Sequence, residues 1–242
     1  MTPSLRELSL PLRALFTSFL LLMGIGYLMA LSYLFLVDVE PHQKMGMGLV
    51  SGIAMKYHGD ASGTRLEAAL RGSMAGQISD DERERIIRWI RAGAPEAGYP
   101  TIKPILDKNC VSCHSARSGL PVPLLDSLPE LRKVIQIDTG PSIAQLARIS
   151  HVHLFGIGII FLLTGIIFAM SDTPVWFRVS LLVLPYLGIV ADIGSWWLTK
   201  GLPAFGIDVL IGGAIIGLSM GVQILVSLWQ MWLPALRSGP VR

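Results

Sequence analysis

The sequence predicts an all-α membrane protein, with four transmembrane helices and a small helical domain inserted between the first and the second. Composition is the first reason: hydrophobic residues make up 52% of the 242 residues and charged residues 15%, where soluble domains have about 25% charged residues. The second reason is that four long apolar runs are almost free of charge. A formal net charge of +3 without a basic cluster argues against nucleic acid as a partner.

Each apolar run is long enough to cross a bilayer, because a spanning helix needs about 20 mostly apolar residues. Between the charged residues at or beyond their ends, the four runs contain a single charged residue, Asp192. Lipid cannot satisfy exposed backbone polar groups, so the runs are expected to be helical. The first run is longer than a signal-peptide core of about 7–15 residues, so we expect an uncleaved anchor. The predicted spans are residues 14–37, 152–170, 177–199 and 207–233.

Positive charges beside the spans predict the orientation, because short cytoplasmic flanks are enriched in lysine and arginine. With the N-terminus in the cytoplasm, the short outer loop holds only Lys200. Both termini are therefore expected on the cytoplasmic side and residues 38–149 on the outer side. The inner flanks would then hold Arg6, Arg13, Arg178, Arg237 and Arg242.

The predicted outer domain, residues 38–149, holds most of the charged residues. Ser79 and Glu82 are spaced as a capping box, which predicts a helix that starts after Ser79 and stops at Gly93. A second helix is expected over residues 64–71. Prolines are frequent in the later half of the domain, so loops are expected there.

Cys110-Val111-Ser112-Cys113-His114 fits C-x-x-C-H, the pattern of covalent haem c attachment. Two thiols must reach two vinyl groups on one edge of the porphyrin, and the adjacent imidazole must reach the iron. Two residues between the cysteines allow a single helical turn to meet these demands. Histidine is a usual axial ligand of haem iron, so Cys110, Cys113 and His114 are the predicted haem-binding residues, with His114 proximal.

Three further kinds of site use a C-x-x-C pair. A thioredoxin-like motif lies in a βαβ unit, which this sequence does not predict. A four-ligand zinc site needs a second pair, and the chain has only two cysteines. A structural disulfide stays open as an alternative, since an outer compartment permits it.

The segment Ile102–Ser115 resembles the haem-attachment helix of small bacterial monohaem cytochromes c. The segment Gly72–Ser79 and the helix after it, which includes Trp89-Ile90-Arg91-Ala92-Gly93-Ala94, resemble their distal-methionine loop and final helix. Those proteins place C-x-x-C-H first, so the order here implies a permuted domain. The resemblance covers roughly residues 64–118. It implies one covalent haem c, on the periplasmic side of a bacterial inner membrane.

Met74, in the segment that resembles the distal loop, is the predicted distal ligand of the haem iron. A thioether ligand raises the reduction potential of the haem, whereas a second histidine, such as His58, would lower it. Met74 could instead fill a hydrophobic core, which is a common role of methionine. Further candidates for the distal position are Met45, Met47, Met55 and His42, and the position could also be open.

Three ionisable residues lie at or within the spans and predict either simple packing or a second site. His151 and His153 open the second span, and Asp192 lies about 12 Å inside the third. In a purely structural role, the histidines would lie at the membrane interface and Asp192 would form a hydrogen bond within the bundle. A functional role could be a haem b held by His42 with His151 or His153. It could also be a quinol site with His153 and Asp192 as general bases.

Two further features of the spans predict helix packing and membrane placement. His151 and His153 are two residues apart, so at most one of them is expected to face any one site. Trp196 and Trp197 suit an aromatic belt at the membrane interface. Glycines with GxxxG spacing at 213, 217 and 221 predict a tight contact of the last span, within the bundle or with a partner subunit.

These features favour a membrane-bound c-type cytochrome subunit that passes electrons between a membrane complex or quinol pool and an outer redox partner. The expected partners are the lipid bilayer and redox proteins of the same membrane. A second hypothesis is a quinol-oxidising cytochrome with a quinol or haem b in the bundle. A third, of a different class, is a haem-based sensor or an assembly factor. An electron-transfer subunit is favoured over a stand-alone enzyme, because the sequence contains no further catalytic motif.

Overall fold

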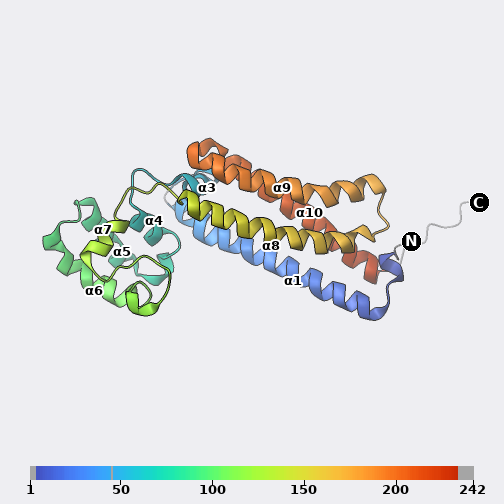
Figure 1. Cartoon of the computed structure of the whole chain (residues 1–242), viewed down its shortest axis with the longest axis horizontal. Helices are drawn as coiled ribbons and strands as arrows, with labels where there is room; N and C mark the ends of the chain where they lie inside the picture. Colours follow the sequence, from blue (N-terminus) through green and yellow to red (C-terminus); the bar gives the residue numbers. More distant parts are fainter. Residues whose placement is uncertain (1–3, 45, 234–242) are drawn as a thin grey trace, which may run out of the picture. The chain divides into compact units, whose positions relative to one another are not determined.

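The computed structural model describes residues 4–44 and 46–233, and the chain divides into two compact units. One unit combines the residues up to Phe35 with those from Ser142 onward, and the other is Leu36–Pro141. Within the described residues, regular structure is helical apart from an isolated bridge between Thr64 and Ile137. The predicted all-α class is therefore confirmed for these residues (Figure 1).

Four helices of the first unit are long and apolar enough to cross a membrane, which confirms the four predicted spans. Long apolar sequence explains their length, since lipid favours a helix whose backbone groups bond one another. The first continues into a π-helical turn, Phe35–Val39. The helices are α1 (Leu10–Leu34), α8 (Ile143–Ala169), α9 (Val175–Gly201) and α10 (Gly206–Trp232).

Helix α8 begins earlier than the predicted span, and its first turns lie in the segment predicted as the end of the outer domain. Ser142 is the N-cap residue and forms a capping box with Gln145. This local signal starts the helix ahead of Arg148, because a helix can extend beyond the apolar layer that hydropathy detects. The membrane unit accordingly starts again at Ser142, whereas the predicted outer domain extends to residue 149.

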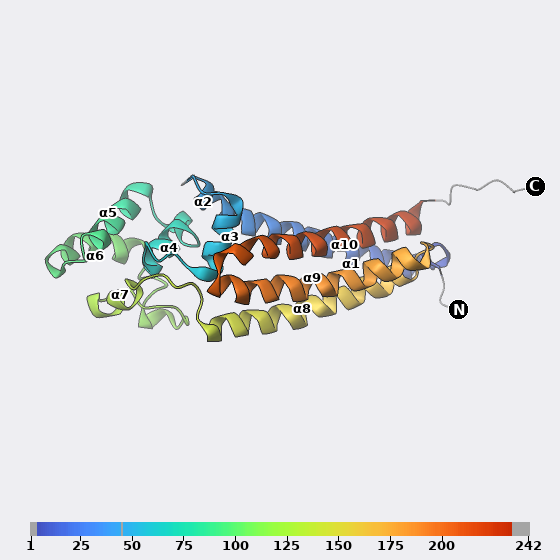
Figure 2. The same cartoon turned by 90° about the horizontal axis from the view of Figure 1, so that it is seen from above.

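Helices α1, α8, α9 and α10 run side by side as a bundle (Figures 1 and 2). Glycines permit the closest approach between α9 and α10: a Cβ atom on Gly212 would lie 2.8 Å from Asp192 Cα. A side chain on Gly217 would collide with Tyr27 of α1, whereas Gly213 and Gly221 have no atom within 4 Å of a Cβ position. The predicted glycine contact within the bundle is thus confirmed for Gly217, and a contact of Gly213 or Gly221 with a partner subunit stays a prediction.

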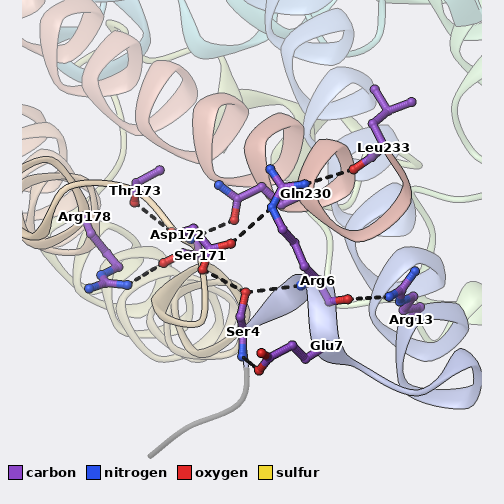
Figure 3. Close-up of polar contacts among 10 residues, drawn as sticks. All are labelled: Ser4, Arg6, Glu7, Arg13, Ser171, Asp172, Thr173, Arg178, Gln230 and Leu233. Atoms are coloured by element: carbon purple, nitrogen blue, oxygen red, sulfur yellow. Dashed lines mark hydrogen bonds and ion pairs between the residues drawn. The ribbon is translucent and has the colours of Figure 1, made fainter. Parts of the chain in front are cut away.

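The end of the bundle that carries the N-terminal segment is fixed by a polar network around Asp172 (Figure 3). Its carboxylate accepts hydrogen bonds from Ser4 Oγ (2.8 Å) and Arg6 Nε (3.1 Å). Its backbone N–H donates to Gln230 Oε1 at 2.8 Å. The loop between α8 and α9 is therefore joined to both α10 and the N-terminal segment. Arg237 and Arg242, which support the predicted orientation, lie outside the described residues.

The second unit consists of short helices around one hydrophobic core. The predicted helices over residues 64–71 and after Ser79 are present as α4 and α5, with Thr64 and Ser79 as N-caps. The core gathers Ile86, Ile87 and further apolar residues of α4, α5, α6 and α7. The helices are α2 (Glu40–Lys44), α3 (Leu49–His58), α4 (Arg65–Arg71), α5 (Asp80–Arg91), α6 (Tyr99–Asn109) and α7 (Leu128–Val134).

Candidate functional site

The C-x-x-C-H motif lies on a single turn that follows α6. Helix α6 ends at Asn109, and the N–H of Cys110 donates to Leu106 O at 2.8 Å. The N–H groups of Cys113 and His114 then both donate to Cys110 O, at 3.1 and 2.8 Å. The motif therefore has the one-turn geometry that the two-residue spacing predicts.

The imidazole of His114 is held by the loop after the motif. Its Nδ1 lies 2.7 Å from Pro123 O, and since a carbonyl only accepts, Nδ1 carries the proton. The N–H of Leu125 donates to His114 O at 2.9 Å, and the Leu125 side chain is buried in the core. Nε2 has no protein partner among the described residues. Histidines that bind metals usually donate from the opposite ring nitrogen in this way, which fixes the ring and its tautomer.

Both cysteines are free, so the disulfide that the sequence left open is not formed in the structure. Cys110 is half-buried against the core, and Cys113 is exposed. Burial raises the pKa of the Cys110 thiol, and the nearby Glu82 carboxylate raises it further. Among the residues described, no group of three or more His, Cys, Asp or Glu residues could hold a metal ion, so a zinc site has no ligand set there.

This donor set fits a covalently attached haem on chemical grounds. Two thiols without a partner in a disulfide lie one helical turn apart at the surface of the unit. The adjacent histidine keeps Nε2 available, while its ring is fixed by Pro123. Covalent attachment needs reachable sulfurs, and axial ligation needs an oriented neutral imidazole. The motif meets both demands.

Met74 lies on the surface, with 37% of it exposed, just before the short 3-10 helix Ala75–Gln77. The hypothesis that Met74 fills the core is therefore wrong for this structure. Ile78, a few residues later, is buried in the core cluster against which Cys110 packs. This shared core brings the segment that follows Met74 towards the haem motif.

Glu82 joins the start of α5 to the end of α6. Its carboxylate accepts hydrogen bonds from Lys108 Nζ (2.9 Å) and Asn109 Nδ2 (3.2 Å). The bond from Lys108, followed by that from Ser79, lowers the pKa of Glu82. Since Asn109 immediately precedes Cys110, the capping turn of α5 is held beside the haem motif.

The rival candidates for the distal ligand lie on α2 and α3 or between them. Helix α3 carries Met55 and ends at His58; both are half-buried, as is Met47. His42, on α2, places Nδ1 2.9 Å from Asp38 O. Met45 lies outside the described residues. The identity of the distal ligand stays a prediction.

In the membrane unit, the structure brings His153 and Asp192 to one aromatic residue, Trp196. The His153 ring meets Trp196 edge-on at 5.2 Å between ring centroids. The indole Nε1 of Trp196 donates to Asp192 Oδ1 at 3.2 Å. His151 is exposed and packs on Phe155 of its own helix at 5.0 Å between ring centroids. As expected from their spacing, only one of the two histidines faces this group.

Two members of this group are not among the predicted site residues. The sequence predicts Trp196 in an interfacial belt, although its position four residues after Asp192 puts both on one helix face. Tyr27 of α1 donates to Gly213 O at 3.3 Å and lies close enough to Asp192 to interact with its charge. Helix periodicity could have found Trp196, but Tyr27 is distant in sequence and carries no such signal. His42 belongs to the second unit, so its pairing with His151 or His153 in a haem b site stays a prediction.

Comparison with known proteins bears on the membrane unit only. A family model described as a transmembrane helical domain matches residues 136–238, which include α8, α9 and α10 and make up less than half of the chain. No curated protein and no solved structure matches this chain. The match supports the membrane assignment of these helices and does not extend to the C-x-x-C-H motif.

Proposed function

We propose that the protein is a membrane-bound c-type cytochrome subunit that transfers electrons. The observation that carries this proposal is the arrangement of His114, whose Nδ1 is fixed by Pro123 O at 2.7 Å directly after two free cysteines on one turn. A haem attached there would supply a reversible one-electron couple at its iron. Electron transfer then needs no further catalytic residue in the chain.

The chain's own residues have distinct parts in this proposal. Cys110 and Cys113 would hold the porphyrin through thioethers, and Cys110 packs partly buried against the core. His114 is oriented for the iron by its hydrogen bond to Pro123. Met74 supplies a thioether from the surface loop before α5, which favours the reduced iron and so a high potential. Met74 is the proposed distal ligand, and His58 is its main rival.

The membrane unit holds the haem unit at the bilayer, where its partners are. Tethering replaces free diffusion by a high effective concentration at a membrane-bound partner. Four spans exceed what a tether needs, so we propose that the bundle also docks on further subunits of a membrane complex. The predicted orientation places both termini in the cytoplasm of a bacterium and the haem unit in the periplasm.

The proposal is tested by the intact mass of the full chain, expressed with the haem c maturation machinery and purified in detergent. A mass increase of one haem, retained after denaturation, is expected, together with a haem c spectrum by pyridine haemochrome. A Cys110→Ala/Cys113→Ala variant should lose both signals, whereas a Ser112→Ala variant between them should keep both. The bare polypeptide mass for the wild-type chain would refute the proposal.

A further inference from the structure

We propose that His153, Trp196, Asp192 and Tyr27 form a binding site for the head group of a quinol, a second site in the membrane bundle. The inference rests on the proposed function only for its electron acceptor. The site belongs entirely to the membrane unit. Four helices contribute to it, which distinguishes it from a chance pair of polar residues.

The four residues form a continuous chain of contacts across the bundle. His153 of α8 packs on Trp196 of α9, whose indole donates to Asp192. The backbone of Asp192 lies against Gly212 of α10, where a Cβ would be 2.8 Å away. One residue on, Gly213 O accepts the hydrogen bond from Tyr27 of α1. Every span therefore takes part.

These residues lie towards the same end of the bundle, where α1 ends, α8 begins and α9 is joined to α10. At about 1.5 Å per residue, Tyr27 and Asp192 lie roughly 10–15 Å from the outer ends of their apolar runs, and His153 lies within the first turn of its run. Ionisable residues at such a depth are costly unless they pair or serve a function. The tight fit at Gly212 shows that the helices close around Asp192, whereas Gly213 beside Tyr27 has no atom within 4 Å of a Cβ position.

His153 has a hydrogen-bond acceptor that a ligand could use. Its Nδ1 lies 2.9 Å from Ile149 O, so Nδ1 carries the proton and Nε2 is left as an acceptor. Among the described residues, Nε2 has no partner, and the ring is half-buried against Trp196. Because His153 lies at the outer end of its apolar run, a donor that arrives through the lipid can reach this acceptor.

A quinol meets these demands better than a phospholipid does. It dissolves among acyl chains and presents two hydroxyl groups, one of which can donate to His153 Nε2. Its aromatic ring suits a site lined by Trp196 and Tyr27. A phospholipid head group fits poorly, because its phosphate would be repelled by the Asp192 carboxylate.

The proposed chemistry balances as follows. Oxidation of one quinol to quinone releases two protons and two electrons. His153 Nε2 accepts the proton of one hydroxyl, and Asp192 accepts the proton of the second, as general bases. The oxidant would be a ferric haem c held by Cys110, Cys113 and His114; it would take one electron at a time, so two turnovers with a periplasmic electron acceptor would consume one quinol.

The test compares matched substitutions in the purified, haem-loaded full chain. His153→Phe keeps a ring against Trp196 but removes Nε2, and His151→Phe, on the same helix, is its control. Asp192→Asn is matched by Asp208→Asn, in the first turn of α10. With decylubiquinol and menadiol as electron donors, His153→Phe and Asp192→Asn should reduce the haem about a hundredfold more slowly than wild type. The two controls should stay close to wild type, and dithionite should reduce all variants alike.

A second measurement does not depend on the haem. A photoreactive azidoquinone should label peptides that contain His153 or Trp196, and excess decylubiquinone should prevent this labelling. Wild-type rates in both site variants, or labelling only elsewhere, would overturn the quinol site. A chain that lacks haem but shows protectable labelling would overturn the proposed function alone.

Discussion

Glu67 offers the sharpest test of how the second unit, Leu36–Pro141, is held together. Its side chain is almost fully buried, with 5% exposed, at the start of α4. Its carboxylate accepts from Thr64 N at 2.8 Å and from Arg91 Nε at 2.9 Å, so it caps α4 and joins it to the end of α5. The loop with Met74 lies between these two helices.

Replacing Glu67 with alanine should destabilise the second unit by about 1–2 kcal/mol. The partly buried Thr64 N–H loses its acceptor, which costs about 1 kcal/mol, whereas the hydrogen bond from Glu67 N to Thr64 Oγ is kept. The ion pair adds at most about 0.5 kcal/mol, because Arg91 is 59% exposed. For a unit of about 100 residues, the melting temperature should fall by about 5–15 °C.

The assay is thermal unfolding of the full chain, followed by haem absorbance and circular dichroism. Glu67→Gln is the matched control, because its amide oxygen can still accept from Thr64 N while the charge is lost; its cost should stay below about 1 kcal/mol. If Glu67→Ala melts within about 3 °C of wild type, less than about 1 kcal/mol is lost and the reasoning from these contacts is refuted.

Three further outcomes are expected. Met74→Leu should lower the midpoint potential of the haem in a spectroelectrochemical titration, whereas Met47→Leu should not; an unchanged potential removes Met74 as a ligand. Leu125→Ala should lower the free energy of unfolding by about 2–5 kcal/mol in chemical denaturation. The substitution truncates a side chain that is buried in the core and follows the loop that orients His114. The pKa of Glu82 is lowered in the folded state. The stability that its carboxylate contributes is therefore present above the ordinary pKa of 4.5 and is lost as the pH falls through the lowered pKa. Melting temperatures between about pH 6 and 3, in ordinary buffers, should therefore fall less in Glu82→Gln than in wild type, and parallel curves would contradict this.

Much of the fold could be predicted from local sequence signals. Apolar runs that are almost free of charge locate all four spans, and the capping pattern at Ser79 marks a helix that the structure contains. Helix α8 starts earlier than its apolar run, because hydropathy reports where lipid begins and a capping box at Ser142 reports where the helix begins. The spacing of Cys110, Cys113 and His114 likewise predicts a one-turn motif.

The sequence by itself determined which segments are apolar enough for a membrane and which residues carry ligand chemistry, because both follow from residue type and short spacing. Only the tertiary structure decided that Pro123 orients His114, that Met74 lies on the surface, and that Tyr27 bonds to Gly213 O across the bundle. Such contacts join residues that no short spacing connects. They depend on how helices and loops pack, which no local pattern of one sequence specifies.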